Sequence, residues 1–125
     1  MSPALGEEKL IDALIALHEA YLRCEQATEM TTLERLQVEP FSQLAISKGV
    51  EQVGEMSHRV LRKFPSFAAQ YSTIPLRESF QLRNRISHGY ETLDWNVIWR
   101  VATRSVPEFR RQLEPILREA GEDVP

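Results

Sequence analysis

Apolar residues recur at the three- and four-residue spacing of amphipathic helices along most of this 125-residue chain. The pattern predicts four helices, over residues 7–26, 40–64, 75–89 and 94–120. Signals for strands are weak, because glycine is scarce, at 5 of 125 residues, and Asn-Gly and Asp-Gly turns are absent. Short connections between the segments indicate an all-α fold, an antiparallel four-helix bundle. His18 lies on the apolar stripe of the first helix and is expected to be a core or interface histidine.

The fourth predicted helix contains two prolines, Pro107 and Pro115. Apolar residues nevertheless recur every seven positions across both prolines, in two rows that begin at Trp95 and Trp99. An unbroken repeat predicts one long, kinked C-terminal helix. The alternative is a break at Ser105, which is placed to begin a capping box.

Three glycines and one aspartate mark predicted contacts and helix ends. Gly49 and Gly54 lie inside the second predicted helix, where glycine costs about 0.5–1 kcal/mol relative to alanine. Two such residues indicate that a neighbouring helix approaches closely. Gly89 is expected to end the third helix in a left-handed conformation, and Asp94 to cap the start of the fourth.

Length and composition are typical of one folded domain. The chain is 42% hydrophobic and 26% charged, and we expect a single helical domain over residues 1–125 with frayed ends at 1–6 and 121–125. It has no run of 18 apolar residues and no signal-peptide pattern, which predicts a cytoplasmic protein without membrane contact. Cys24 is the single cysteine, so an internal disulfide and a cysteine-rich zinc site are excluded.

Charge is distributed unevenly, although the net charge is only −3. Residues 1–58 carry four cations against ten carboxylates, whereas residues 59–118 carry eleven cations, ten of them arginine, against five carboxylates. A half rich in arginine indicates a surface that binds a polyanion, since guanidinium groups suit bidentate contacts to phosphate. The alternative is that acidic and basic helices pack side by side with their charges in solvent.

The third predicted helix has an arginine in the middle of its apolar face. At 100° per residue, Leu76, Phe80 and Ile86 all lie within about 60° of Arg83. An unpaired buried charge costs several kcal/mol, so Arg83 must either pair with a carboxylate or contact a ligand. Glu55, on the second helix, is the candidate carboxylate, and both interpretations remain open.

The residues around this arginine resemble those of a known family. Residues 83–90 read Arg-Asn-Arg-Ile-Ser-His-Gly-Tyr, and Arg83, His88 and Tyr90 match a motif of arginine, four residues, histidine, one residue and tyrosine. The motif is typical of the HEPN superfamily, and the chain resembles most closely the HepT-type toxins that are paired with minimal nucleotidyltransferases. Two further stretches are similar to the family, Val53-Gly54-Glu55 and Ile74-Pro75.

The resemblance implies a toxin that is a metal-independent endoribonuclease, with RNA as substrate and no cofactor. It implies that His88 exchanges protons and that Arg83 stabilises charge on the phosphate, with Asn84 and Glu55 as supporting residues. On a regular helix, Arg83 and His88 point about 140° apart and lie roughly 7.5 Å apart along the axis, so one chain presents an incomplete site. A homodimer with the motif beside its two-fold axis would supply two copies of each. His58, on the second predicted helix, is expected to be a solvated histidine, and the alternative is that it approaches the cleft.

Tyr90 has a separate implied role. In HepT-type systems the cognate nucleotidyltransferase antitoxin transfers AMP to the motif tyrosine, which silences the toxin by placing a bulky anion beside Arg83. The structural alternative is that Tyr90 ends an apolar stripe and that His88 is a cation near a helix C-terminus. A functional alternative is a non-catalytic HEPN partner that binds nucleotide or substrate for a nucleotidyltransferase.

Overall fold

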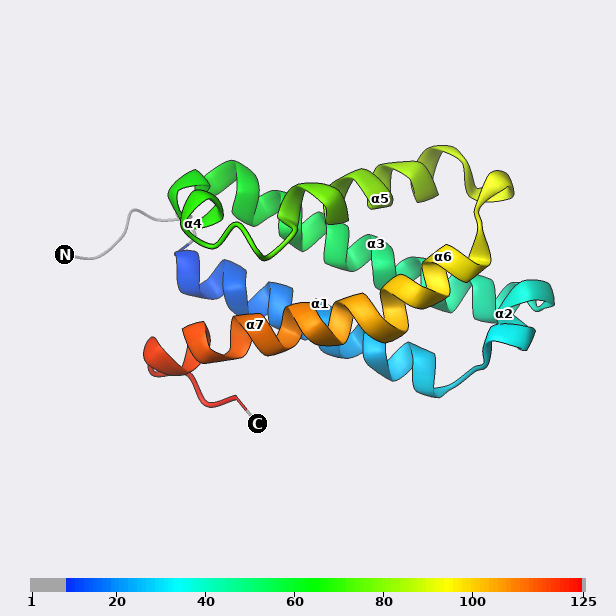
Figure 1. The fold of residues 1–125 in the computed structure, drawn as a ribbon, viewed down its shortest axis with the longest axis horizontal. Coiled ribbons are helices and arrows are strands. Elements are labelled where there is room, and N and C mark those ends of the chain that lie inside the picture. Colours follow the sequence, from blue (N-terminus) through cyan, green and yellow to red (C-terminus); the bar gives the residue numbers. More distant parts are fainter. Residues whose placement is uncertain (1–8, 125) are drawn as a thin grey trace.

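A computed structural model of the chain describes residues 9–124, apart from the side chain of Tyr90, and this part is helical without a strand (Figure 1). The predicted all-α fold is confirmed. The elements, in chain order, are α1 (Leu10–Glu29), α2 (Leu33–Val38), α3 (Pro40–Lys63), α4 (Pro65–Gln70), α5 (Leu76–His88), the 3₁₀ helix η1 (Tyr90–Thr92), α6 (Trp95–Arg100), the π-helical turn η2 (Val101–Ser105) and α7 (Val106–Glu119).

Two short helices lie where the sequence predicts connections. Helix α2 follows Thr32, whose side chain accepts a hydrogen bond from the backbone N–H of Arg35. Helix α4 begins at Pro65, in a stretch predicted to be a loop, and that prediction is wrong. A six-residue helix is too short to show a repeating apolar stripe, so the pattern could not reveal either one. The fold therefore has more helices than the four predicted.

Helix α3 lies between α1 and α5, and α7 packs against α1 (Figure 1). Fully buried side chains from these helices meet in the core, among them Leu17 of α1, Ile46 of α3 and Leu113 of α7. Helix α5 buries Leu76 and Ile86 and makes its main contacts with α3. The helix that carries the motif therefore lies at the edge of the fold.

Residues 95–119 form one continuous helical segment, as predicted, and not two helices separated at Ser105. Ser105 has helical backbone angles and its side chain makes no capping hydrogen bond. The π-helical turn η2 ends two residues before Pro107, which lacks the N–H that a regular helix requires. The segment bends between α6 and α7 (Figure 1). Asp94 caps the start of the segment, as predicted, by accepting a hydrogen bond from the Asn96 N–H.

The two glycines inside α3 each face a neighbouring helix at close range. A Cβ atom at Gly49 would lie 3.2 Å from the Cα of Cys24 in α1. A Cβ atom at Gly54 would lie 2.7 Å from the carbonyl oxygen of Ser79 in α5, and closer still to the Cβ of Arg83. The predicted close approach is confirmed at both positions.

The ends of α5 and α7 differ in their glycine geometry. The left-handed conformation predicted for Gly89 is wrong, since the φ of Gly89 is −146°. The physical reason is that the chain continues into η1, where the Thr92 N–H donates a hydrogen bond to the Gly89 carbonyl. Gly121, after α7, has the left-handed conformation instead, with a φ of +88°. Beyond it, the Glu122 N–H donates to a carbonyl of α7 and Val124 packs against the core. The predicted frayed residues 1–6 lie outside the described residues.

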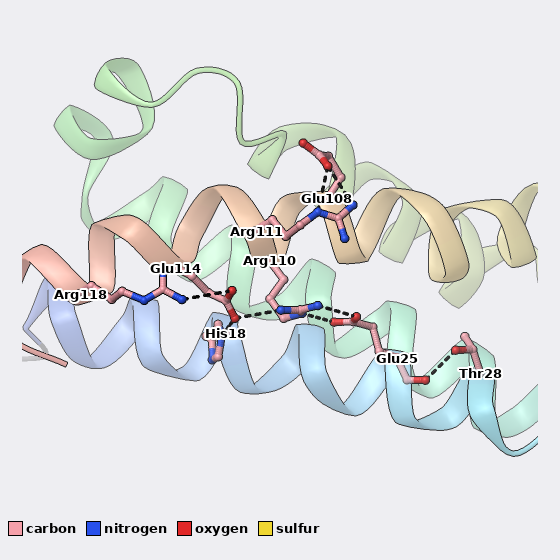
Figure 2. A network of polar contacts seen from close by, with 8 residues as sticks. All are labelled: His18, Glu25, Thr28, Glu108, Arg110, Arg111, Glu114 and Arg118. Carbon is pink, nitrogen blue, oxygen red and sulfur yellow. Dashed lines mark hydrogen bonds and ion pairs between the residues drawn. The ribbon is translucent and has the colours of Figure 1, made fainter. Parts of the chain in front are cut away.

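A polar network joins α1 to α7 inside the fold (Figure 2). His18 Nε2 lies 2.8 Å from a carboxylate oxygen of Glu114, and the two residues are only 5% and 6% exposed. Arg110 donates to the same oxygen of Glu114 and, from its Nε at 2.6 Å, to Glu25. His18 is therefore a core residue whose polar group is satisfied, as predicted.

None of the helices in residues 9–124 is long and apolar enough to span a membrane.

Candidate functional site

The candidate residues lie where α5 packs against α3, along a surface that we call the α3–α5 seam. Three pairs of side chains connect the helices, Ser87 with Glu51, Arg83 with Glu55 and Phe80 with His58. Each step forward along α3 is matched by an equal step back along α5, so the two helices run antiparallel in register. The register alone decides which side chains can meet across the seam.

Arg83 reaches Glu55 because Gly54 allows the two helices to approach. Its Nε atom forms an ion pair with Glu55 Oε1, without an aligned hydrogen bond, and its Nη1 donates to Asn84 Oδ1 at 3.1 Å. The Arg83 side chain is 30% exposed and that of Glu55 is 43% exposed. The ion pair, one of the two interpretations left open for Arg83, therefore exists within one chain. It lies at the surface, where a ligand can contact the guanidinium group and where such a pair contributes little to stability.

His88 is exposed at the C-terminal end of α5. Its Nδ1 lies 2.8 Å from the backbone carbonyl oxygen of Asn84, one turn earlier in the helix. Because a carbonyl oxygen only accepts hydrogen bonds, Nδ1 must carry the proton. The neutral imidazole therefore keeps Nε2 as the nitrogen that can take a proton from a ligand.

Asn84 connects the two residues that the sequence assigns to chemistry. Its side-chain oxygen accepts a hydrogen bond from Arg83, and its backbone carbonyl accepts one from His88. No polar contact joins Arg83 and His88 directly in the described part of the chain. One chain thus brings Arg83, Glu55 and Asn84 together and places His88 more than one helical turn away.

Tyr90 begins η1, two residues after the end of α5. Its side chain lies outside the described part, so its modification stays a prediction. Within residues 9–124, no three His, Cys, Asp or Glu side chains lie close enough together to hold a metal ion.

The site also includes His58, for which the sequence favours exposure to solvent over an approach to the cleft. His58 is half-buried, and its ring stacks on Phe80 with a centroid distance of 3.8 Å and an angle of 15° between the planes. Its Nδ1 atom is enclosed and has no hydrogen-bond partner among the described residues. The expected exposure of His58 is wrong, and its alternative place beside the site depends on the register between α3 and α5, which no local pattern reveals.

Residues 17–116 match the family model described as "Ribonuclease HepT-like". The chain is 25% identical over 105 residues to "Probable ribonuclease HepT" of Thermococcus cleftensis, a match that covers 84% of this chain and 93% of that protein. It is 27% identical over 79 residues to "Putative RNase MJ0125" of Methanocaldococcus jannaschii, which covers 62% of this chain and 65% of that protein. No solved structure gives a significant match to the chain.

Proposed function

Because the chain belongs to the HepT-like ribonuclease family, we propose that it is an endoribonuclease that cleaves RNA without a metal ion, using His88 and Arg83. The observation that carries this proposal is the hydrogen bond from His88 Nδ1 to the Asn84 carbonyl. It presents Nε2 at the surface of the helix that also bears an accessible guanidinium group. Phosphodiester cleavage by a ribose hydroxyl requires an imidazole that can accept a proton and a cation that stabilises the phosphate charge, and α5 carries both.

In this reaction His88 Nε2 removes the proton of a ribose 2′-OH, and the 2′-oxygen forms a bond to the adjacent phosphorus. The bond between phosphorus and the 5′-oxygen breaks, and the 5′-oxygen takes up a proton from the protonated histidine at the same position in a second copy of the chain. The products are a 2′,3′-cyclic phosphate and a 5′-hydroxyl end. Arg83 stabilises the negative charge that develops on the phosphate oxygens, and Asn84 holds both side chains in position.

A homodimer completes the site. The reaction needs both a base and an acid, whereas each chain has one exposed histidine on α5. Since α5 lies at the edge of the fold, with Arg83 partly exposed and His88 exposed, its accessible side can meet a second copy of the chain. A two-fold axis beside α5 supplies a second His88 and a second Arg83 to the same cleft.

The biological role that we assign is that of a toxin held inactive by a cognate nucleotidyltransferase antitoxin. Transfer of AMP to Tyr90 places a phosphate two residues from His88, where it competes with the RNA phosphate for Arg83. The second candidate is a non-catalytic partner of such a nucleotidyltransferase. The ion pair of Arg83 with Glu55 supports this alternative, because the guanidinium group is already neutralised within one chain.

Cleavage of RNA by the purified protein in EDTA tests the proposal. We expect cyclic phosphate ends, and we expect His88→Ala to lower the rate about 10²- to 10⁴-fold, since proton transfer contributes a factor of that size. Arg83→Ala should lower it about 10²- to 10³-fold, whereas Arg104→Ala, which removes an exposed arginine from η2, should leave the rate unchanged.

Each other outcome contradicts a named part of the proposal. Cleavage that EDTA abolishes excludes the metal-independent mechanism. Full activity of His88→Ala excludes the assigned base. If the wild-type protein cuts no RNA and its expression leaves cell growth unaffected, the non-catalytic alternative holds. Sedimentation velocity measures whether the active species contains two chains.

A further inference from the structure

The α3–α5 seam ends in a hollow that the proposed reaction does not use. The hollow has a volume of about 580 Å³ and lies between the end of α3, helix α4 and the start of α5. Small-molecule pockets typically measure about 300–1,000 Å³. We call it the seam pocket, and its walls include His58, Leu61, Arg62, Ala69, Ile74 and Arg77.

Cations and apolar side chains share the walls of the seam pocket. Arg62 comes from the last turn of α3 and Arg77 from the first turn of α5, and both are exposed. Neither forms an ion pair within residues 9–124, and Glu78 is the acidic residue of the lining. Leu61 and Ile74 supply apolar surface. The combination suits a ligand with a negative charge and a flat, largely apolar body.

The seam pocket lies along the same α3–α5 seam as the candidate active site. His58 lines it, stacks on Phe80 and lies one turn after Glu55 on α3. On α5, Arg77 precedes Arg83 by six residues, which is about 9 Å along the helix axis. An RNA strand that has one phosphate in contact with Arg83 can therefore place a neighbouring nucleotide in the seam pocket.

We propose that the seam pocket binds one unpaired nucleotide of the RNA, next to the nucleotide that is cleaved. Arg62 and Arg77 bind its phosphate, and its base packs against Leu61, Ile74 and the His58 wall. This inference rests on the proposed ribonuclease function and specifies the substrate as single-stranded. A base held in an A-form duplex cannot enter such a pocket, whereas an unstacked base can.

Binding of a short, fluorescein-labelled single-stranded RNA tests the assignment by fluorescence anisotropy. The 125-residue chain carries His88→Ala so that the RNA stays intact. Two changes are then compared in this background. Arg62→Ala combined with Arg77→Ala removes both phosphate contacts, and Ala69→Trp fills the pocket without altering charge.

We expect each change to weaken binding at least tenfold. For the double arginine variant, the slope of log affinity against log salt concentration should fall by about 0.7, since the two arginines bind one phosphate and each neutralised phosphate of a single strand contributes about that amount. The matched control, Arg100→Ala combined with Arg104→Ala, removes two exposed arginines from α6 and η2 and should change affinity less than twofold. Duplex RNA should bind more weakly than the single strand, and free AMP should not displace it.

Unchanged binding in either pocket variant, with helicity and unfolding midpoint preserved, overturns the proposal. Displacement of the RNA by free AMP at low concentration also overturns it, because the pocket would then serve a mononucleotide. The two proposals fail separately. If the wild type cuts RNA while the pocket variants bind normally, the pocket assignment is wrong. If RNA binds through the pocket but is never cut, the ribonuclease proposal is wrong.

Discussion

Gly54 is the position where one added methyl group tests the packing of the candidate site. In Gly54→Ala, the new Cβ would lie 2.7 Å from the Ser79 carbonyl oxygen and closer still to the Cβ of Arg83. Ordinary van der Waals contact begins at 3.4 Å, so α5 must move away from α3 by about 0.7 Å or more. Backbone and Cβ atoms cannot rotate aside, so the whole helix has to shift.

Two opposing effects set the size of the change. Alanine gains about 1 kcal/mol over glycine inside a helix, whereas overpacking costs about 1–3 kcal/mol and more where backbone must move. We therefore expect Gly54→Ala to lower the free energy of unfolding by about 1–2 kcal/mol, which corresponds to a fall in Tm of about 4–8 °C. Displacement of Arg83 should also reduce kcat/KM for RNA cleavage about 10- to 100-fold.

Circular dichroism during urea and thermal unfolding measures the first effect, and RNA cleavage measures the second. Gly49→Ala is the matched control on the same helix, because its Cβ would meet Cys24 of α1 at 3.2 Å and lies away from the seam. We expect it to keep full activity and to change stability by less than about 1 kcal/mol. If Gly54→Ala retains the wild-type midpoint and activity, or if Gly49→Ala loses as much of both, the close-approach argument is refuted.

Two further predictions concern buried groups. Burial raises the pKa of Glu114, but hydrogen bonds from His18 and Arg110 together lower this pKa by more than burial raises it. The pKa of Glu114 therefore lies below its ordinary value of 4.5. The stabilisation from this carboxylate is therefore complete above about pH 4.5 and is lost as the pH falls. In urea unfolding, the difference in unfolding free energy between wild type and Glu114→Gln should shrink from about pH 6 to pH 3. A difference that stays constant over this range contradicts the prediction. Burial raises the pKa of Cys24 to about 12, so iodoacetamide should modify it only after unfolding, and rapid modification of the native protein, seen by mass spectrometry, would contradict its enclosure.

Apolar periodicity was sufficient to locate the long helices. The stripes predicted α1, α3, α5 and the continuous helical segment over residues 95–119, and the seven-residue repeat across Pro107 correctly favoured one helix over a break. The pattern could not predict that η2 is π-helical, because this depends on how the backbone adjusts next to a proline. It also misassigned Gly89, whose conformation depends on the turn that follows it.

The candidate site was only partly accessible from the sequence. The position of Arg83 on an apolar face and the availability of Glu55 made their ion pair one of two open interpretations, because both follow from helical spacing and charge. The link through Asn84 and the stack of His58 on Phe80 depend on rotamers and on the register between two helices far apart in sequence. Neither leaves a signal in a single sequence.

The peripheral position of α5 has a consequence for its dynamics. Leu76 and Ile86 anchor it to the rest of the fold, and its main neighbour is α3, so α5 can open locally while α1, α3 and α7 stay folded. Its local opening therefore has a lower free energy than global unfolding. An RNA strand or a second subunit that binds only when α5 is packed on α3 stabilises this packed state by mass action. As more of the α3–α5 seam is occupied by such a partner, a larger fraction of the molecules therefore has α5 ordered.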